Sequence, residues 1–232
     1  MRVMTFNIQH CRNFIEDKID FEIMANTILK CNPDIVGLNE VRGEGPHPDY
    51  TAQTEMLAEL TNMPYYYFAP AIELPNGLYG NAFLSKIPII NAEIIAIPDP
   101  DEKRYTSHYE TRCVLKLKLE SDIVVLVTHF GLNPDEQANA LITVLSNIVS
   151  EKCILMGDMN LTPKENIISL IKEKMKDTAD KFEEPMLSFP SDIPTRKIDY
   201  IFVTPDIEVR YAEIPSIVAS DHRPHIADLV IN

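Results

Sequence analysis

The sequence is poor in several residue types that mark particular classes of protein. It has no tryptophan and only 7 glycines among 232 residues, and so little glycine excludes a collagen-like repeat. No apolar run approaches the roughly 20 residues needed to cross a bilayer. The first residues also lack the apolar core and small-residue cleavage site of a signal peptide. These absences predict a cytoplasmic protein with no stable membrane insertion.

Cysteine is scarce as well, and its spacing is uninformative for metal binding. The four cysteines form no CxxC pair and no Cys/His cluster with the spacing of a zinc site. Without a secretory signal we interpret them as reduced thiols that pack as small apolar residues.

Basic residues are outnumbered by acidic ones. Lys and Arg total 21 against 35 Asp and Glu, so the formal net charge is −14. This balance argues against a protein that holds nucleic acid or anionic lipid by bulk electrostatics alone. If the substrate is an anion, positively charged groups at the site must offset the negative electrostatic potential of the protein.

Apolar residues are plentiful and evenly spread. They make up 45% of the chain and charged residues 24%, which is typical of a soluble globular protein. We find no internal repeat, low-complexity tract or linker. The chain is therefore expected to form one mixed α/β domain over residues 1–232.

Hydrophobic periodicity predicts alternating strands and helices. The turn Ser121-Asp122 should join two strands in a hairpin, and the polar, proline-bearing stretch 174–196 is expected to be a long surface loop. The predicted helices cover 20–32, 51–62, 134–150 and a segment starting at Pro163. The predicted strands cover 2–7, 34–39, 65–69, 82–85, 89–97, 113–119, 123–129, 153–156, 198–204, 209–214 and 225–231.

Polar side chains stand at the ends of these apolar strands. Because strand ends converge on one rim of a sheet, we expect these side chains to form one site. Carboxylates, amides and two imidazoles, with no thiolate, suit Mg²⁺ or Mn²⁺ better than zinc. The residues are Asn7, Glu40, His129, Asp158, Asn160, Asp199, Asp221 and His222.

At these positions the sequence resembles the endonuclease/exonuclease/phosphatase family, the deoxyribonuclease I-like metal-dependent phosphohydrolases. The motifs occur in the family's order and span nearly the whole chain. They are Thr5-Phe6-Asn7, Leu38-Asn39-Glu40, Gly80-Asn81-Ala82, Thr128-His129-Phe130-Gly131-Leu132, Gly157-Asp158-Met159-Asn160, Lys197-Ile198-Asp199-Tyr200-Ile201-Phe202 and Ser220-Asp221-His222-Arg223-Pro224.

The resemblance implies a four-layer α/β/β/α sandwich with two mixed central sheets flanked by helices. It also implies cleavage of phosphoester bonds with a divalent cation, Mg²⁺ or Mn²⁺. In that frame Glu40 would be the main metal carboxylate, with Asn7 beside it and Asp221 as a second carboxylate on the metal side.

The remaining motif residues would carry the chemistry. The resemblance implies that Asp158 orients or deprotonates the attacking water and that Asn160 holds the scissile phosphate. His222 would contact phosphoryl oxygens or act as an acid or base, held by Asp199. His129 occupies the position of a second catalytic histidine.

Two further residues are candidates for substrate binding. Arg112 matches a less constant family position near the phosphate, although it could instead form a structural pair with Glu110. Asn81 belongs to the Gly80-Asn81-Ala82 stretch and is the second candidate.

General chemistry agrees with these roles. A cation that bridges phosphate oxygens offsets the repulsion between a nucleophile and an anionic ester, and in-line attack needs a positioned base. An imidazole titrates near neutrality, and an aspartate partner fixes its tautomer and raises its pKa.

Three hypotheses of function remain open. The favoured one is a small or lipid-derived phosphoester, either a diester or a monoester. The second is DNA or RNA, with nuclease action in the exonuclease III or deoxyribonuclease I manner; scattered basic residues and the lack of tryptophan weigh against it. The third is a non-catalytic binding module, which is disfavoured because every core motif position is present. The oligomeric state stays open.

Overall fold

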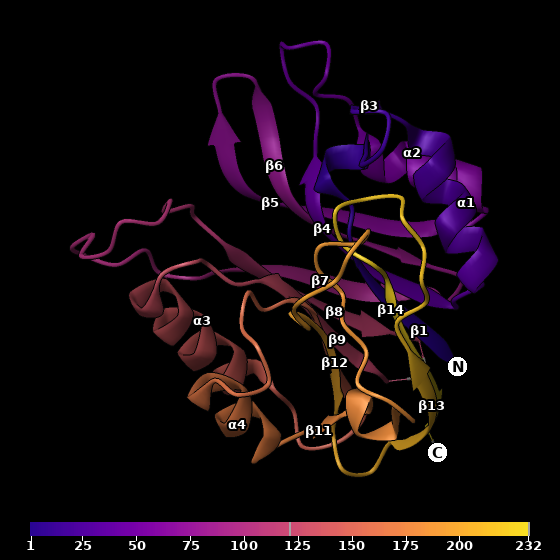
Figure 1. Cartoon of the computed structure of the whole chain (residues 1–232), viewed down its shortest axis with the longest axis vertical. Coiled ribbons are helices and arrows are strands. Elements are labelled where there is room, and N and C mark those ends of the chain that lie inside the picture. Colours follow the sequence, from indigo (N-terminus) through magenta and orange to yellow (C-terminus); the bar gives the residue numbers. More distant parts are fainter. Residues whose placement is uncertain (121, 232) are drawn as a thin grey trace.

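The computed structural model describes residues 1–120 and 122–231, which form two six-stranded sheets packed face to face (Figure 1). Both sheets are mixed. In order across the first sheet, the strands are β13 (Glu208–Glu213), β14 (His225–Val230), β1 (Arg2–Asn7), β4 (Ile35–Arg42), β6 (Gly77–Ser85) and β5 (Tyr65–Leu74). In the second they are β11 (Lys176–Asp177), β12 (Asp199–Val203), β10 (Cys153–Asp158), β9 (Val124–His129), β8 (Cys113–Leu119) and β7 (Ile89–Ala96).

Helices cover the outer faces of both sheets, as Figure 1 shows. Helices α1 (Phe21–Cys31) and α2 (Gln53–Thr61) pack on the first sheet, and α3 (Pro134–Asn147) and α4 (Asn166–Lys172) pack on the second. The predicted four-layer sandwich is confirmed. The smaller elements are the hairpin strands β2 (Arg12–Asn13) and β3 (Lys18–Ile19) and the 3₁₀ turns η1 (Gln9–Cys11) and η2 (Thr178–Lys181).

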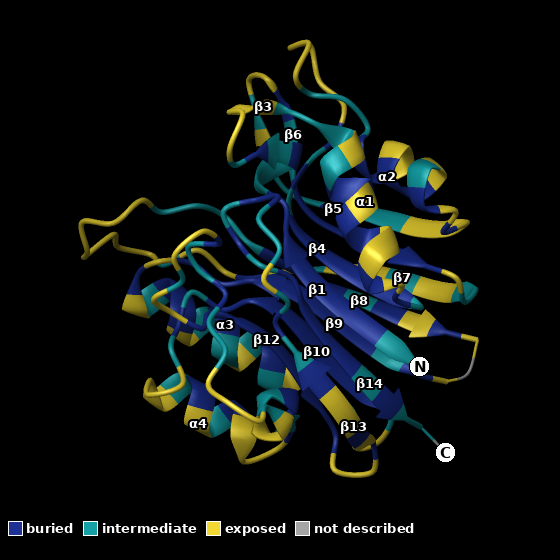
Figure 2. Ribbon diagram, turned by 45° about the vertical axis from the view of Figure 1, so that its right-hand side comes forward, coloured by how far each residue is buried: buried dark blue, intermediate teal, exposed yellow. Residues whose placement is uncertain are grey.

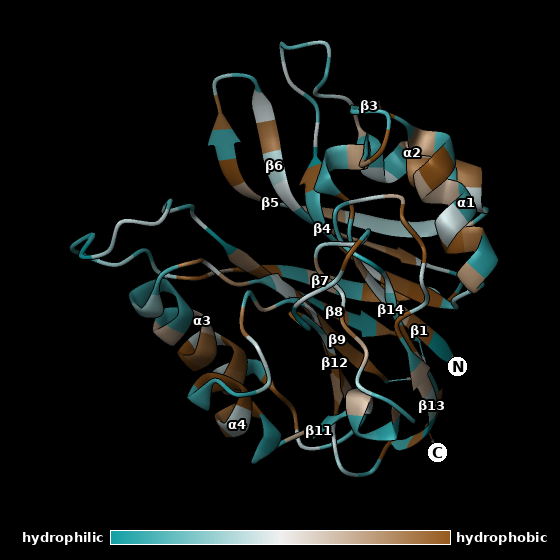
Figure 3. Ribbon diagram, in the orientation of Figure 1, coloured by the Kyte–Doolittle hydropathy of each residue, from teal (hydrophilic) through white to brown (hydrophobic). Residues whose placement is uncertain are grey.

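Three apolar clusters fill the spaces between the four layers. One lies between the sheets and includes Phe83, Val127 and Ile201. The other two lie under the helices on either side. Consequently the central strands are buried over most of their length, while exposed residues gather on helices and loops (Figure 2). The brown, hydrophobic strand interiors in Figure 3 follow the same pattern.

Local sequence signals account for the helix boundaries. The Asp20 side chain accepts a hydrogen bond from the Ile23 N–H at 3.1 Å, and α1 ends at the left-handed Asn32, both standard terminal devices. Helix α3 begins with Pro134 at its first turn and a capping box between Asn133 and Glu136.

Several predicted boundaries need correction. Helix α4 begins at Asn166 because Pro163 lies in a turn closed by the Glu165 N–H on the Thr162 carbonyl. Strand β6 begins at Gly77, five residues earlier than predicted, because its hairpin with β5 pairs as far as that glycine.

The stretch 174–196 is only partly a surface loop. It contains β11 and η2, and Ser188 and Ser191 within it are fully buried. Of the predicted turn at Ser121-Asp122, Ser121 lies outside the described residues; the Asp122 N–H donates to the Leu119 carbonyl at 3.1 Å.

The sheet topology brings the predicted site residues to one edge. The parallel strands β1 and β4 place Asn7 beside Asn39, next to Glu40. In the second sheet Asp158 pairs in register with His129 on one side and with Asp199 on the other. Because polar groups of the two sheets also contact one another across the sandwich, both sets of strand ends meet in one place.

Among the residues that the structure describes, no helix combines the length and apolar character required to cross a membrane.

Candidate active site

Asn39 joins the two sheets directly beneath the predicted site. Its Nδ2 donates to Asn81 Oδ1 at 2.8 Å and to the Thr128 carbonyl at 2.9 Å. Its Oδ1 accepts the backbone N–H of Asp158 at 2.9 Å. Asn39 lies inside β4, at its irregular pairing with β6 and not at the strand end predicted from the sequence. This single buried amide therefore fixes β4 against the ends of β9 and β10.

Glu40 and Asn7 form the first-sheet side of the site. The Asn7 Nδ2 donates to Glu40 Oε1 at 3.0 Å and to Asp158 Oδ2 at 3.2 Å. Glu40 has a left-handed φ of 58° and lies where the pairing of β4 with β6 is irregular. Such a bulge redirects a side chain, here placing the carboxylate beside Asn7.

Asp221 stands on the loop before β14. Burial raises the pKa of its carboxyl, and the charge of His222 opposes that shift while the charge of Glu40 adds to it. Ser220 Oγ donates to Asp221 Oδ1 at 3.0 Å. The two carboxylates of Glu40 and Asp221 are thus close enough to repel one another, an arrangement that a bound cation would relieve.

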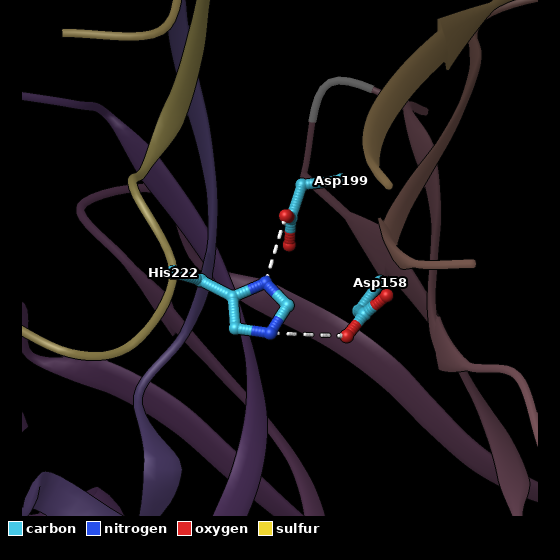
Figure 4. A group of neighbouring side chains, drawn as sticks. All are labelled: Asp158, Asp199 and His222. Carbon is cyan, nitrogen blue, oxygen red and sulfur yellow. Dashed lines mark hydrogen bonds and ion pairs between the residues drawn. The ribbon is translucent and has the colours of Figure 1, made fainter. Parts of the chain in front are cut away.

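His222 lies between two aspartates, as Figure 4 shows. Its Nδ1 is 2.8 Å from Asp199 Oδ2, and its Nε2 is 3.6 Å from Asp158 Oδ2. Burial alone would lower the pKa of His222, but the negative charges of Asp199 and Asp158 outweigh it and raise the pKa to about 10. The imidazole is therefore positively charged at neutral pH.

Asp158 is buried at the centre of this group. Burial raises its pKa to about 7, and the positive charge of His222 opposes the shift. A buried carboxylate with a raised pKa is a stronger base than an ordinary aspartate, which suits it to accepting a proton from water.

His129 differs from His222 in charge. Its Nδ1 is 3.0 Å from a guanidinium nitrogen of Arg112, and guanidinium only donates, so Nδ1 is unprotonated. Burial, followed by the charge of Arg112, holds the pKa of His129 well below its usual range. The proton of this neutral imidazole is therefore on Nε2, which lies 3.5 Å from Asp158 Oδ2. The Asn160 Nδ2 is 3.1 Å from the same ring nitrogen, but as a donor it bonds to the Phe130 carbonyl and not to the protonated Nε2.

The two candidate substrate-binding residues are placed differently. Arg112 reaches His129 and is held by Glu110, with Nη1 2.6 Å from Oε1, so both the pairing with Glu110 and a position beside the site are present. Asn81 is buried, and its Nδ2 donates to the Cys113 carbonyl at 3.1 Å. Both ends of the Asn81 amide are thus used between the sheets, and its contact with substrate stays a prediction.

Asn160 also belongs to the group. Its Nδ2 donates to the Phe130 carbonyl at 2.9 Å, and its backbone N–H donates to Asp158 Oδ1 at 2.8 Å. Its φ is 51°, a left-handed conformation that asparagine tolerates better than most residues.

Sequence reasoning missed some residues that build the site. Asn39 had a visible signal, since it is a polar residue at the end of an apolar strand. Tyr79 had none: burial, then the charges of Glu40 and Glu110, raise the pKa of its hydroxyl well above the usual value. Ser188 and Phe189 lie in the stretch expected to be a loop.

The donor set fits a hard divalent cation. Ligand atoms of Asp158, Asp199 and His222 all lie within 4.8 Å of one another, but the protonated imidazole of His222 has no lone pair for a cation. The oxygens of Asn7, Glu40 and Asp221 next to this cluster are the remaining donors. Within the described part of the chain, the buried Oδ1 of Asp199 has no hydrogen-bond partner. Carboxylate and amide oxygens are the ligands that Mg²⁺ and Mn²⁺ prefer.

A mixed α/β sandwich with carboxylates, amides and two histidines at one edge defines the class of deoxyribonuclease I-like proteins. The model of the Endonuclease/Exonuclease/phosphatase family matches residues 4–222, and the chain belongs to that family. The resemblance inferred from the motifs is therefore confirmed. No curated protein sequence matches the chain.

Solved structures share the fold along the whole chain. An endonuclease/exonuclease/phosphatase from Beutenbergia cavernae DSM 12333 is similar with a TM-score of 0.83 and 24% identity, covering 100% of this chain and 71% of that one. The mannosyl-6-phosphatase Bt3783 of Bacteroides thetaiotaomicron VPI-5482 has a TM-score of 0.76 and 15% identity, with 100% of both chains covered. The human Nocturnin catalytic domain with bound sulfate has a TM-score of 0.72 and 17% identity, covering 100% and 93%.

Proposed function

We propose that this protein is a divalent-metal-dependent hydrolase of phosphoester bonds that acts on a small or lipid-derived substrate. The observation that carries the proposal is the buried Asp158 carboxylate, placed between the charged His222 and the neutral His129 and hydrogen-bonded to Asn7. A carboxylate base between one charged and one neutral imidazole suits in-line attack of water on a phosphate.

Glu40, Asp221 and Asn7 would hold the cation. Mg²⁺ or Mn²⁺ there would supply positive charge that stabilises the phosphoryl oxygens and the leaving oxygen.

The chain's own residues carry the remaining roles. Asp158 accepts a proton from the attacking water as the new P–O bond forms and the P–O bond to the leaving group breaks, and the leaving oxygen takes a proton from solvent. His222 presents its charged imidazole to a phosphoryl oxygen, and Asp199 keeps the Nδ1 proton in place. The amide of Asn160 and the guanidinium of Arg112 lie against His129 and hold the substrate phosphate from the opposite side.

Hydrolysis of DNA or RNA is the second candidate, and one observation favours it. The exposed loop between β7 and β8 carries Lys103, Arg104 and Tyr105 and leads into Arg112. However, Arg104 is paired with Glu102, at 3.1 Å, and acidic residues interrupt the stretch. A nuclease that follows a strand needs a more continuous set of basic contacts.

A substrate panel tests the proposal. Purified protein is assayed with Mg²⁺, with Mn²⁺ and with EDTA on a generic phosphodiester, a generic phosphomonoester, plasmid DNA and RNA. We expect metal-dependent release from one of the small esters, cut at least about a hundredfold in D158A and in H222A without loss of fold. The exposed Asp180 provides the matched control D180A.

The outcomes separate the alternatives. EDTA-sensitive nicking of DNA or RNA that is lost in D158A would favour the nuclease. Full activity of purified D158A would refute the assignment of the base, and no activity on any substrate would favour the binding module.

A further inference from the structure

The segment Ser188–Ser191 connects the two stretches of chain that carry Asp199 and His222. Ser188 Oγ accepts the backbone N–H groups of Ile198 and Asp199 at 3.2 and 3.4 Å. The Ser188 carbonyl accepts the N–H of Arg223 at 2.8 Å. The buried Ser188 therefore connects Asp199, the partner of His222, to Arg223, the residue that follows His222.

Ser191 adds a second set of contacts to the same loop. Its N–H donates to the Asp221 carbonyl at 2.7 Å, and its Oγ donates to the Ser220 carbonyl at 2.5 Å. Its carbonyl accepts Nε of Arg223 at 2.6 Å. Both serines are fully buried, so the segment is built into the site rather than lying over it.

Between the two serines, the ring of Phe189 packs on the imidazole of His222. The ring centroids are 4.7 Å apart with planes at 48°, and the guanidinium of Arg196 lies 5.0 Å from the Phe189 centroid. The backbones of Phe189 and Arg196 also pair, with N···O distances of 3.0 and 2.9 Å. The π face of phenylalanine attracts cations, and the guanidinium of Arg196 lies over this ring.

This packing meets a specific requirement of His222. Its imidazole has one short hydrogen bond, from Nδ1 to Asp199, while Nε2 is 3.6 Å from Asp158. A ring held at a single atom can tilt about that bond, and a tilt would move Nε2 away from the reacting group. The Phe189 ring, in tilted contact with the imidazole, restricts that movement.

We propose that Phe189 is a positioning residue that holds the plane of the His222 imidazole, and that Ser188 and Ser191 keep Phe189 and the Asp199–His222 pair in register. The inference rests on the proposed function, in which His222 acts at the phosphoryl group.

The test compares F189L, which removes the aromatic ring, with F189Y, which keeps it. The matched control is F182L, because Phe182 packs on His225 at 5.3 Å and that histidine has no assigned role. The first readout is the proton resonance of His222 Nδ1–H in protein without added metal, assigned by its loss in H222Q. The second is kcat and KM on the ester identified by the substrate panel.

We expect F189L to shift and broaden the Nδ1–H resonance and to lower kcat about 3- to 10-fold, with little change in KM. F189Y should retain the wild-type resonance and kcat, and F182L should change neither.

Two results would overturn the inference. One is an F189L protein with the wild-type resonance and kcat. The other is a loss in F189L that F189Y fails to restore, which would indicate only a structural role. Because the resonance needs no substrate, it decides the positioning role even if the wild-type protein hydrolyses no phosphoester and the proposed function fails.

Discussion

Asp199 and His222 form a buried ion pair, with Oδ2 of the carboxylate 2.8 Å from Nδ1 of the imidazole. The side chain of Asp199 is fully buried and that of His222 is 4% exposed. Charges are rarely placed so deep unless they are paired. The pair keeps one proton on Nδ1 and directs Nε2 toward Asp158, so the orientation and the charge of His222 both depend on Asp199.

The first prediction follows from that dependence. In D199N the amide cannot supply negative charge, and its NH₂ group can donate to Nδ1, which would favour the opposite tautomer. We expect kcat to fall about 10²- to 10⁴-fold. Steady-state kinetics would measure the loss, and circular dichroism would show an unchanged fold.

The exposed Asp180 supplies the comparison. D180N makes the same chemical change at an exposed ion pair with Lys172, where pairs contribute little, and should retain normal kcat. Equal activity of D199N and D180N would show that the Asp199–His222 pair has no part in turnover.

The second prediction concerns the amide that joins the two sheets. N39A would leave three buried groups without a partner: Asn81 Oδ1, the Thr128 carbonyl and the Asp158 N–H. Each such group costs about 1–3 kcal/mol, so we expect a loss of at least about 3 kcal/mol in the free energy of unfolding.

Urea unfolding would measure that loss, with N91A as the matched control because Asn91 is exposed on β7. An N39A protein as stable as N91A would mean that the sheets are held together without this amide.

The third prediction is a pH dependence of stability set by a buried lysine. Lys197 is 5% exposed, and its Nζ lies 3.5 Å from Asp177 Oδ2 and 3.2 Å from the centroid of the Tyr200 ring. Burial lowers the pKa of Lys197 from 10.5 to about 8, although Asp177 opposes the shift. Between these two values the unfolded chain binds more protons than the folded one, so the lysine's contribution to stability rises with pH.

The comparison of wild type with K197M isolates that contribution. We expect the variant to be less stable at neutral pH because Asp177 is left buried without its partner. The difference in free energy of unfolding should widen by about 2–3 kcal/mol between about pH 7.5 and 10. The exposed Lys164 gives the control K164M, whose difference from wild type should stay flat. A gap between wild type and K197M that narrows with rising pH would contradict this sign.

The parts of the fold that could be predicted are those determined by residues close together in the sequence. The apolar residues Val3, Met4 and Phe6 before Asn7 predict β1, and Asp20 followed by a 3–4 residue apolar spacing predicts α1, within one or two residues of the observed bounds. Strand ends also predicted where the polar residues gather, although β4 runs to Arg42, three residues beyond the Asn39 that pairs with the last residue of β1.

What could not be predicted depends on partners distant in sequence. Ser188 and Ser191 look like loop residues because serine is polar, yet they are buried since their hydrogen bonds reach residues 10 to 35 positions away, from Ile198 to Arg223. Likewise, nothing in the order of residues indicates that Asn81 uses its amide between the sheets or that Arg112 fixes the tautomer of His129.

The last prediction addresses the cation through stability rather than activity. Burial and then the charge of Glu40 raise the pKa of Asp221, and repulsion between two carboxylates opposes folding when no cation is bound. E40Q removes that repulsion and keeps an oxygen for the Asn7 amide. We therefore expect E40Q to be at least as stable as wild type in EDTA.

Added Mg²⁺ should reverse that order. A ligand that binds only the folded protein stabilises it by about 2.7 kcal/mol at a hundredfold excess over its Kd, which raises the Tm of a chain of this size by several degrees. Wild type and the control E93Q, altered at an exposed residue of β7, should show this rise, whereas E40Q should show little. A Mg²⁺-dependent rise in Tm that is equal in all three proteins would place the cation away from Glu40, and the role proposed for this carboxylate would fail.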